Sequence, residues 1–166
     1  MKNLILIAFC CLMTCLSHAQ IKASDVFTKI GKMPDQFDEM YNGGDVADQL
    51  TLIYIPGINN PFEKFYMKQK AAKTKKDVLI VGGFKEMMNA MSFESKKKHL
   101  QEALSIQYKK GSTVLLDLES ELGQLLSLKG YSIINVSKKK NQILSINDYG
   151  FDRVEFFKAL AAYETK

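Results

Sequence analysis

Cysteines offer the widest range of chemistry in this sequence, and all three lie near its start. Cys10, Cys11 and Cys15 lie in an apolar stretch, and no cysteine follows them in the 166 residues. A thiolate can act as a nucleophile, as half of a redox couple or as a soft metal ligand. Once the N-terminal stretch is removed, the remaining chain has no cysteine nucleophile, no disulfide and no thiolate metal site.

Carboxylates are the second group with chemical potential. Asp117, Glu119 and Glu121 come directly after one predicted strand in the sequence, and Asp148 comes after another. Their spacing matches no metal-binding motif, and acids at such junctions commonly stabilise the positive start of a helix. A structural role is therefore the main interpretation. Catalysis by carboxylates such as Asp117, Glu119 and Asp148 is the alternative.

Methionines and a histidine form a third candidate group. Met87, Met88 and Met91 lie close together, with His99 further along the chain. Thioethers suit Cu(I), which makes a methionine-rich copper site a further alternative. Helix packing, however, requires the same spacings of three and four residues. We predict no metal and no cofactor, and we find no residue set that matches a catalytic motif.

The N-terminus has the features of an export signal. Lys2 is the only charge before the apolar or small run Leu4–Leu16, which is shorter than the about twenty apolar residues that span a bilayer. Ser17-His18-Ala19 then offers a cleavage site, so residues 1–19 are predicted to be a signal peptide, leaving no transmembrane segment in the mature chain. The alternative is a lipoprotein signal, in which Cys15 is acylated and anchors the protein.

Residues 20–166 are predicted to form one domain, with its core at about 45–163. A chain of this length buries a hydrophobic core without disulfides or metals. The net charge of +5 comes from scattered lysines, and Arg153 is the only arginine. Nucleic-acid binders concentrate both residue types on one surface, so no nucleic-acid partner is expected. The composition leaves the oligomeric state open.

Strands alternate with helices along this domain, because short apolar runs rich in β-branched residues are separated by segments of helical periodicity. The predicted strands are Leu50–Ile55, Asp77–Val81, Ser112–Leu116, Tyr131–Val136 and Gln142–Ile146. The predicted helices are Pro61–Ala72, Lys85–Tyr108 in two pieces, a short helix through Leu118–Leu126, and Asp152–Tyr163. In the last helix the residues expected to share one face are Val154, Phe157, Leu160 and Ala161. Before the first strand comes a polar lead that contains Pro34 and the turn-like Asn42-Gly43-Gly44-Asp45.

This order predicts the α/β class, with three layers in which a central mixed β-sheet is flanked by helices. The last two strands are expected to form an antiparallel hairpin, since the lysine-rich turn that joins them is short.

Several segments resemble the thioredoxin-like superfamily, in particular its redoxin and thiol-disulfide interchange branch. Val114–Asp117 is similar to the strand that ends in Asp in that family, and Gly130–Val136 is similar to its Gly-x-Pro-Thr strand. The charged turn before Gln142 and the start of the final helix at Gly150-Phe151-Asp152 also follow the family order. The resemblance covers roughly residues 31–163 and implies a thioredoxin-like fold.

The chain departs from this family at the positions that carry its chemistry. The resemblance places Asn60 and Glu63 where the two CxxC cysteines would lie, and Ser132 where the cis-proline would lie. Asn60 as N-cap, Pro61 at the first helical position and Glu63 at the third suit a structural helix start. The resemblance therefore implies a redox-inactive member.

The expected function is that of an exported binding or accessory protein of the bacterial envelope. Relatives bind extended peptides in a groove beside the CxxC helix, which makes an envelope protein or peptide the expected partner. Phe62 and Tyr131 would offer apolar contact, and the backbone of Ser132 would pair with a peptide strand. The residues assigned to this groove are Asn60, Pro61, Phe62, Glu63, Tyr131 and Ser132.

Overall fold

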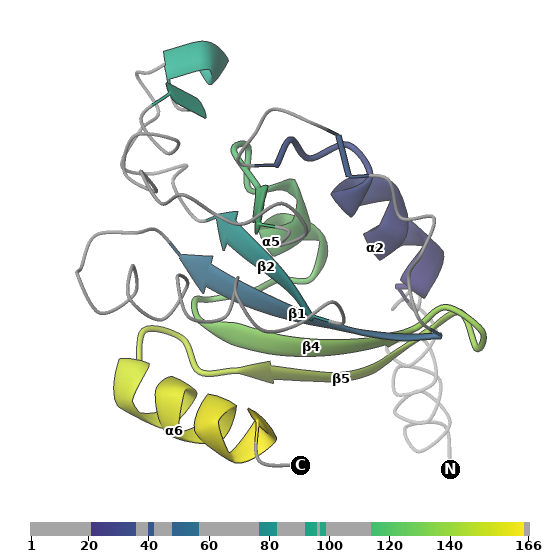
Figure 1. The fold of residues 1–166 in the computed structure, drawn as a ribbon, viewed down its shortest axis with the longest axis vertical. Coiled ribbons are helices and arrows are strands. Elements are labelled where there is room, and N and C mark those ends of the chain that lie inside the picture. The colour runs from purple at the N-terminus through teal and green to yellow at the C-terminus, as the bar shows by residue number, and fades with distance from the viewer. Residues whose placement is uncertain are drawn as a thin grey trace, which may run out of the picture.

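The described part of the chain forms one mixed sheet with helices on both faces (Figure 1). A computed structural model describes residues 21–35, 40–41, 48–56, 77–82, 92–95, 97–98 and 114–164. The predicted signal 1–19, the predicted helix Pro61–Ala72 and most of Lys85–Tyr108 lie outside these residues.

Five strands make up the sheet, in the order β3-β2-β1-β4-β5. Their bounds are Gln49–Pro56 for β1, Asp77–Gly82 for β2, Val114–Leu116 for β3, Ser132–Ser137 for β4 and Gln142–Asp148 for β5. β1 pairs in parallel with β2, and β2 in parallel with β3, while β4 pairs antiparallel with both β1 and β5. The five predicted strands are confirmed to within two residues at each end. β1 and β3 are runs of mostly apolar side chains that the sheet buries on both faces, whereas β5 is largely exposed.

The hairpin predicted at the end of the sheet is confirmed. β4 and β5 run antiparallel and are joined by a turn of lysines that ends at Asn141. Asn141 has φ of 49°, a left-handed conformation that asparagine tolerates better than most residues. The register shifts between Asn135 and Val136, where β5 carries one extra residue.

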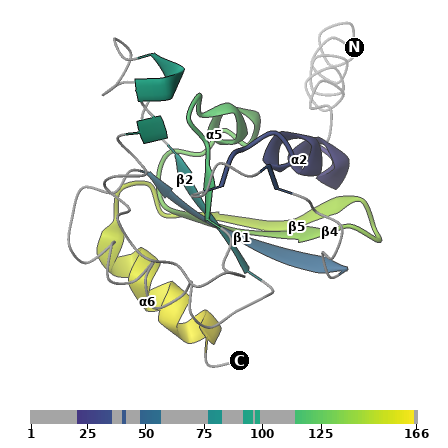
Figure 2. The same cartoon turned by 45° about the horizontal axis from the view of Figure 1, so that its top comes forward.

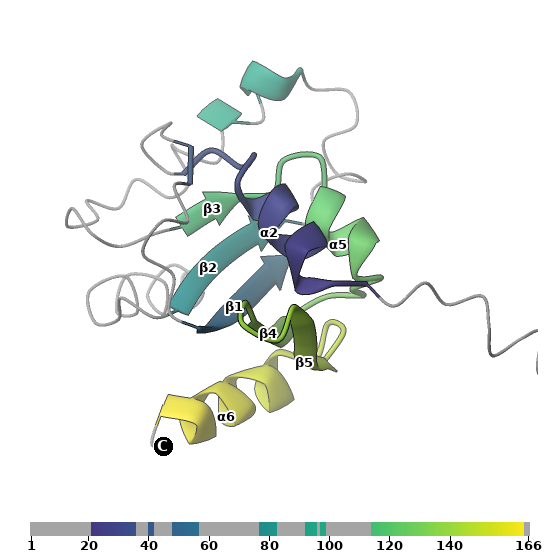
Figure 3. The ribbon, with the colours of Figure 1, turned by 90° about the vertical axis from the view of Figure 1, so that its right-hand side faces the viewer.

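Helices cover the two faces of the sheet as three layers (Figures 2 and 3). α2 (Ala23–Ile30) and α5 (Glu121–Leu125) lie on one face, and α6 (Arg153–Glu164) lies on the other. β1 supplies both cores: Leu52 and Tyr54 point toward α2 and α5, whereas Ile53 and Ile55 point toward α6. The predicted three-layer α/β architecture is thus confirmed. Among the described helices, none is long and apolar enough to cross a membrane.

Helix α2 is an element that the sequence analysis did not predict. Its side chains Ala23, Val26 and Ile30 are fully buried against the sheet, and Met33 just beyond it is 5% exposed. The spacing of three, four and three residues is helical, but Val26, Thr28 and Ile30 are β-branched and weaken the helical signal. The hydrophobic core therefore begins at Ala23, well before residue 45.

Helix α6 forms where it was predicted, but its buried face is only partly the predicted one. Phe156 and Leu160 are fully buried, whereas Val154 is 76% exposed and Ala161 is also exposed. Phe156 and Leu160 are four residues apart and so lie one above the other on the side that meets β1. The predicted apolar face is confirmed for Leu160 and for Phe157, which packs against the core, but was wrong for Val154 and Ala161. Large apolar residues lie on more than one side of this helix, so only packing against the sheet decides which of them are buried.

Candidate functional site

One half of the predicted groove, Tyr131 and Ser132, lies where β4 begins. β1 ends at Pro56, and its antiparallel register with β4 places Tyr54 opposite Ser132. The start of β4 is therefore beside the end of β1. Asn60, Pro61, Phe62 and Glu63 follow Pro56 in the sequence but lie outside the described residues.

Tyr131 is a core residue and is only 3% exposed. Its ring centroid lies 5.0 Å from that of Phe156 and 6.4 Å from that of Phe157, on the face that α6 covers. Arg153 donates a hydrogen bond from Nε to the Tyr131 hydroxyl at 3.0 Å. The ring has no exposed face with which to make the apolar contact that was expected of it.

Ser132 is fully buried, and β4 is an interior strand. Its hydroxyl donates to the carbonyl oxygen of Gly130 at 3.1 Å. Its backbone lies opposite Tyr54 in β1 and opposite Asp148 in β5. A peptide strand therefore finds no open sheet edge at Ser132.

Gly130 is required by a close approach of two backbones. Tyr131 donates its N–H to the carbonyl oxygen of Gly150 at 2.7 Å, and Tyr149 donates to that of Tyr131 at 2.8 Å. A side chain at Gly130 would overlap the Gly150 carbonyl. The absence of a side chain at Gly130 thus lets the start of β4 pack against the turn that leads to α6.

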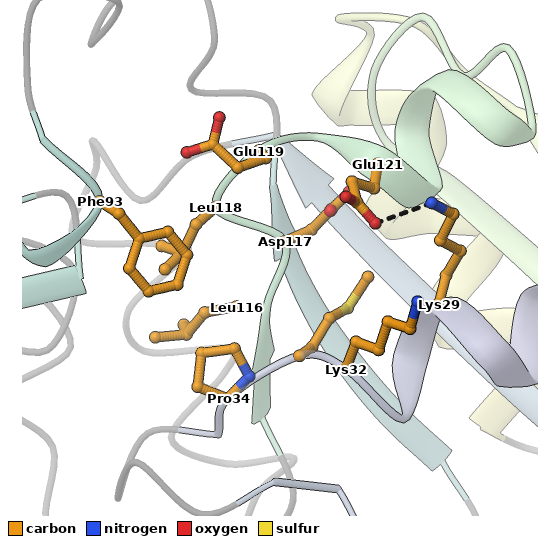
Figure 4. A pocket seen from close by; sticks show the side chains of 10 residues that line it. Lys29, Lys32, Pro34, Phe93, Leu116, Asp117, Leu118, Glu119 and Glu121 are labelled. Atoms are coloured by element: carbon orange, nitrogen blue, oxygen red, sulfur yellow. Dashed lines mark hydrogen bonds and ion pairs between the residues drawn. The ribbon is translucent and has the colours of Figure 1, made fainter.

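A hollow of about 110 Å³ opens at the carboxyl end of β3, on the side of the sheet where β1 also ends (Figure 4). It combines two lysines at the end of α2, three acids around the start of α5 and an apolar side. Its lining residues are Lys29, Lys32, Met33, Pro34, Phe93, Leu116, Asp117, Leu118, Glu119 and Glu121. The lining offers charges of both signs beside an aromatic ring.

Asp117 is the buried acid of this hollow and is 2% exposed. Its carboxylate accepts hydrogen bonds from the N–H groups of Gly123 at 3.1 Å and Leu122 at 3.4 Å, and from the Tyr54 hydroxyl at 3.3 Å. Burial raises the pKa of Asp117 above its usual 3.8, although these hydrogen bonds act in the opposite direction. Asp117 therefore holds the first turn of α5 against β1.

Tyr54 reaches Asp117 through a gap that two glycines leave open. A methyl group at Gly82 of β2 would overlap the Tyr54 ring, and one at Gly123 of α5 would lie 2.8 Å from its hydroxyl. Asp117 was a candidate from the sequence, whereas Tyr54 was predicted only as part of a buried strand, with no polar contact. The run Leu50–Ile55 carries two hydroxyl groups, on Thr51 and Tyr54, and nothing in the local pattern shows which of them meets a carboxylate.

Three solved structures resemble this chain. The exposed lipoprotein thioredoxin of Streptococcus pneumoniae has a TM-score of 0.49 and 12% identity, over 78% of this chain and 96% of that one. A thioredoxin-like protein of Aeropyrum pernix has a TM-score of 0.46 and 9% identity, over 85% and 94%. A peroxiredoxin-like protein of Aquifex aeolicus has a TM-score of 0.44 and 13% identity, over 78% and 81%. No protein-family profile matches the sequence, and no curated protein does.

The decisive observation is the sheet itself, in which three parallel strands are followed by an antiparallel hairpin and a closing helix. The fold is thioredoxin-like. In this thioredoxin-like fold, the hollow at Asp117 lies on the side of the sheet where the parallel strands β1, β2 and β3 have their carboxyl ends.

Of the acids of the alternative catalytic site, Asp117 and Glu119 line the same hollow, whereas Asp148 lies apart from them. Glu121 forms an ion pair with Lys29 at 2.8 Å, and the hydrogen bond from Lys29 lowers the pKa of Glu121. Asp148 is the last residue of β5, at the other side of the sheet from Asp117, and its carboxylate accepts the N–H groups of Lys129 and Gly150. Only Glu119 shares the hollow with Asp117 and Glu121.

The proposed copper ligands Met87, Met88, Met91 and His99 lie outside the described residues. Within the described part of the chain, no three His, Cys, Asp or Glu residues are grouped to hold a metal ion.

Proposed function

We propose that this chain is an exported, redox-inactive thioredoxin-like protein of the bacterial envelope, with a binding or accessory role. The observation that carries the proposal is the position of the thiols. Cys10, Cys11 and Cys15 all precede Ile21, the first described residue of the fold, and no cysteine follows them. A thioredoxin-like fold without a thiol retains its groove but not its exchange chemistry.

The groove of this proposal begins where β1 ends. Asn60 and Glu63 follow Pro56 within a few residues and have the CxxC spacing. The pairing of Tyr54 with Ser132 supports this position, since it brings the start of β4 beside the end of β1. Phe62 is the apolar contact that remains for a partner, because the Tyr131 ring is buried.

The hollow at Asp117 extends the proposed binding surface along the same edge. Lys29 and Lys32 provide positive charge, Glu119 and Glu121 negative charge, and Phe93, which is 45% exposed, an apolar face. Such a mixture suits an extended peptide with alternating side chains better than a single small anion. The proposed partner is therefore an extended segment of an envelope protein.

Export is tested by the mass of the protein recovered from a bacterial host that carries the full-length gene. Cleavage after Ala19 gives a chain that begins at Gln20, which we expect in the envelope fraction. Acylation at Cys15 would instead give a larger, detergent-soluble species that incorporates labelled palmitate. A full-length chain that stays in the cytoplasm would contradict the proposal.

The position of the groove is tested by restoring the thiols. In the mature chain, the double variant Asn60→Cys with Glu63→Cys is expected to form an intramolecular disulfide and to gain insulin-reducing activity, which the unmodified chain lacks. The matched control, Asn60→Cys alone, has no partner thiol. Failure of the folded double variant to form a disulfide would show that Asn60 and Glu63 do not occupy the CxxC position.

The binding role is tested with a photo-crosslinking residue placed at Phe62. We expect it to capture a defined envelope protein, while the same residue placed at the exposed Val154 captures none. Equal labelling at the two positions would contradict a partner in the groove.

A further inference from the structure

Four lysines that are distant in sequence gather at the end of the molecule where the described chain begins. Lys22 precedes α2, and Lys138, Lys139 and Lys140 form the turn between β4 and β5. All four are exposed. Figures 1 and 2 show the start of α2 beside this turn, and Lys22 forms an antiparallel bridge with Gln142.

This basic end, consisting of Lys22 and Lys138–Lys140, is fixed by hydrogen bonds to the rest of the fold. Asn141 accepts the N–H of Ser24 on its side-chain oxygen at 2.8 Å and that of Ala23 on its carbonyl at 3.4 Å. A hollow of about 270 Å³ lies between the two elements, with Lys22 and Lys140 on its rim. The lysines are therefore presented together on one surface.

The basic end carries a surplus of positive charge. Within the described residues, no ion pair involves any of its four lysines. Two acidic residues lie close to it. The carboxylate of Asp25 accepts a hydrogen bond from the backbone N–H of Lys22 at 3.0 Å, and the backbone carbonyl of Asp48 accepts one from the backbone N–H of Lys138 at 2.9 Å. Among the described residues, these four lysines outnumber the two nearby aspartates, and such a surplus of positive charge attracts anions.

We propose that the basic end docks on an anionic lipid bilayer. The apolar run Leu4–Leu16 ends five residues before Ile21, the first described residue. A fully extended chain of five residues is only about 20 Å long, so the fold begins within that distance of the apolar run. Until the signal is cleaved, and permanently if Cys15 is acylated, the basic end is thus held beside the membrane. This inference rests on the export part of the proposed function. Each lysine at an anionic surface increases partitioning by about fivefold.

The test is sedimentation of the purified mature chain with vesicles. We expect binding to vesicles of phosphatidylglycerol and phosphatidylcholine, loss of that binding as salt shortens the range of the attraction, and none to phosphatidylcholine alone. The variant Lys139→Gln with Lys140→Gln is expected to weaken binding roughly 25-fold. The control Lys129→Gln with Lys158→Gln removes the same charge from exposed positions elsewhere and should stay within about twofold of the unmodified chain.

Three results would overturn the proposal. Equal binding to neutral vesicles would exclude an electrostatic surface, and an equal loss in the control would show that only net charge matters. Binding to soluble polyphosphate as tightly as to vesicles would assign the surface to polymers instead of lipids. A second double variant, Lys22→Gln with Lys138→Gln, removes two charges from the basic end while leaving Lys139 and Lys140 unchanged. It is expected to weaken vesicle binding to a similar extent. Because the assay uses purified protein, its outcome does not depend on export, which the N-terminal mass measures separately.

Discussion

Asp117 is a carboxylate kept almost entirely out of water at the end of β3. It accepts two N–H groups from α5 and the Tyr54 hydroxyl, and burial still raises its pKa. An acid whose pKa is higher in the folded chain binds its proton more tightly there than in the unfolded chain. Its contribution to stability is complete below the unfolded value near 3.8 and is lost as pH rises through the folded-state pKa.

The substitution Asp117→Asn removes this titration while keeping an acceptor oxygen and the side-chain volume. We expect the fall in unfolding free energy with rising pH to become shallower above pH 3.8, as measured by urea denaturation across a pH series. Glu121→Gln is the control of opposite sign, because the lowered pKa of Glu121 adds stability that is lost as pH falls. Parallel pH profiles for Asp117→Asn and the unmodified chain would show that Asp117 does not titrate as inferred.

Gly123 shows how one neighbouring atom can reverse the effect of a substitution. Replacing glycine by alanine inside a helix usually stabilises it by about 1 kcal/mol. Here the added methyl group would lie 2.8 Å from the Tyr54 hydroxyl but 3.4 Å from the ring carbon that carries it. We expect Gly123→Ala to destabilise the protein by about 1–3 kcal/mol, and to become neutral or stabilising in the Tyr54→Phe background.

Thermal or urea unfolding of the four chains in this cycle measures the coupling between the two positions. A change of the same sign and size in both backgrounds would mean that the Tyr54 hydroxyl is not the atom that opposes Gly123→Ala.

At the scale of elements, α6 shows that an apolar helix does not select its own buried face. Phe156 and Leu160 are fully buried between the sheet and neighbouring aromatic rings, while Val154 is 76% exposed. Phe156→Ala is expected to cost about 3–5 kcal/mol of unfolding free energy, because it leaves a cavity in the core. The matched control Val154→Ala on the same helix should change stability by less than about 0.5 kcal/mol. Similar losses of unfolding free energy for Phe156→Ala and Val154→Ala would mean that α6 is rotated about its axis relative to the packing described above.

At the scale of the whole molecule, α2 is the element on which one face of the fold depends. Ala23, Val26, Ile30 and Met33 supply apolar surface to the core shared by β1, β4 and α5. A chain that begins at residue 45 loses all of it and exposes the facing side chains of the sheet.

We therefore expect a chain of residues 45–166 to lack a cooperative unfolding transition, whereas residues 20–166 unfold cooperatively in urea when followed by circular dichroism. Equal midpoints for the two chains would show that the core is complete without α2.

Much of the fold was predictable from local pattern. Leu50–Ile55 and Asp77–Val81 are too short for helices and too apolar for loops, and the brief turn before Gln142 requires an antiparallel hairpin. The candidate site was less predictable. Tyr131 was assigned to a groove by analogy, but its ring is buried against Phe156 of α6. Whether this ring is buried or exposed depends on how α6 packs on the sheet, which the sequence near Tyr131 does not encode.

The sequence by itself determined which segments become strands, and it confined the thiols to the first fifteen residues. Both properties are set by side chains adjacent along the chain. Tertiary structure alone decided that α2 covers the sheet, that Tyr54 meets Asp117, and that Lys22 lies beside the lysine turn. These contacts join residues that are far apart in sequence, so they depend on strand order and register, which local periodicity does not encode.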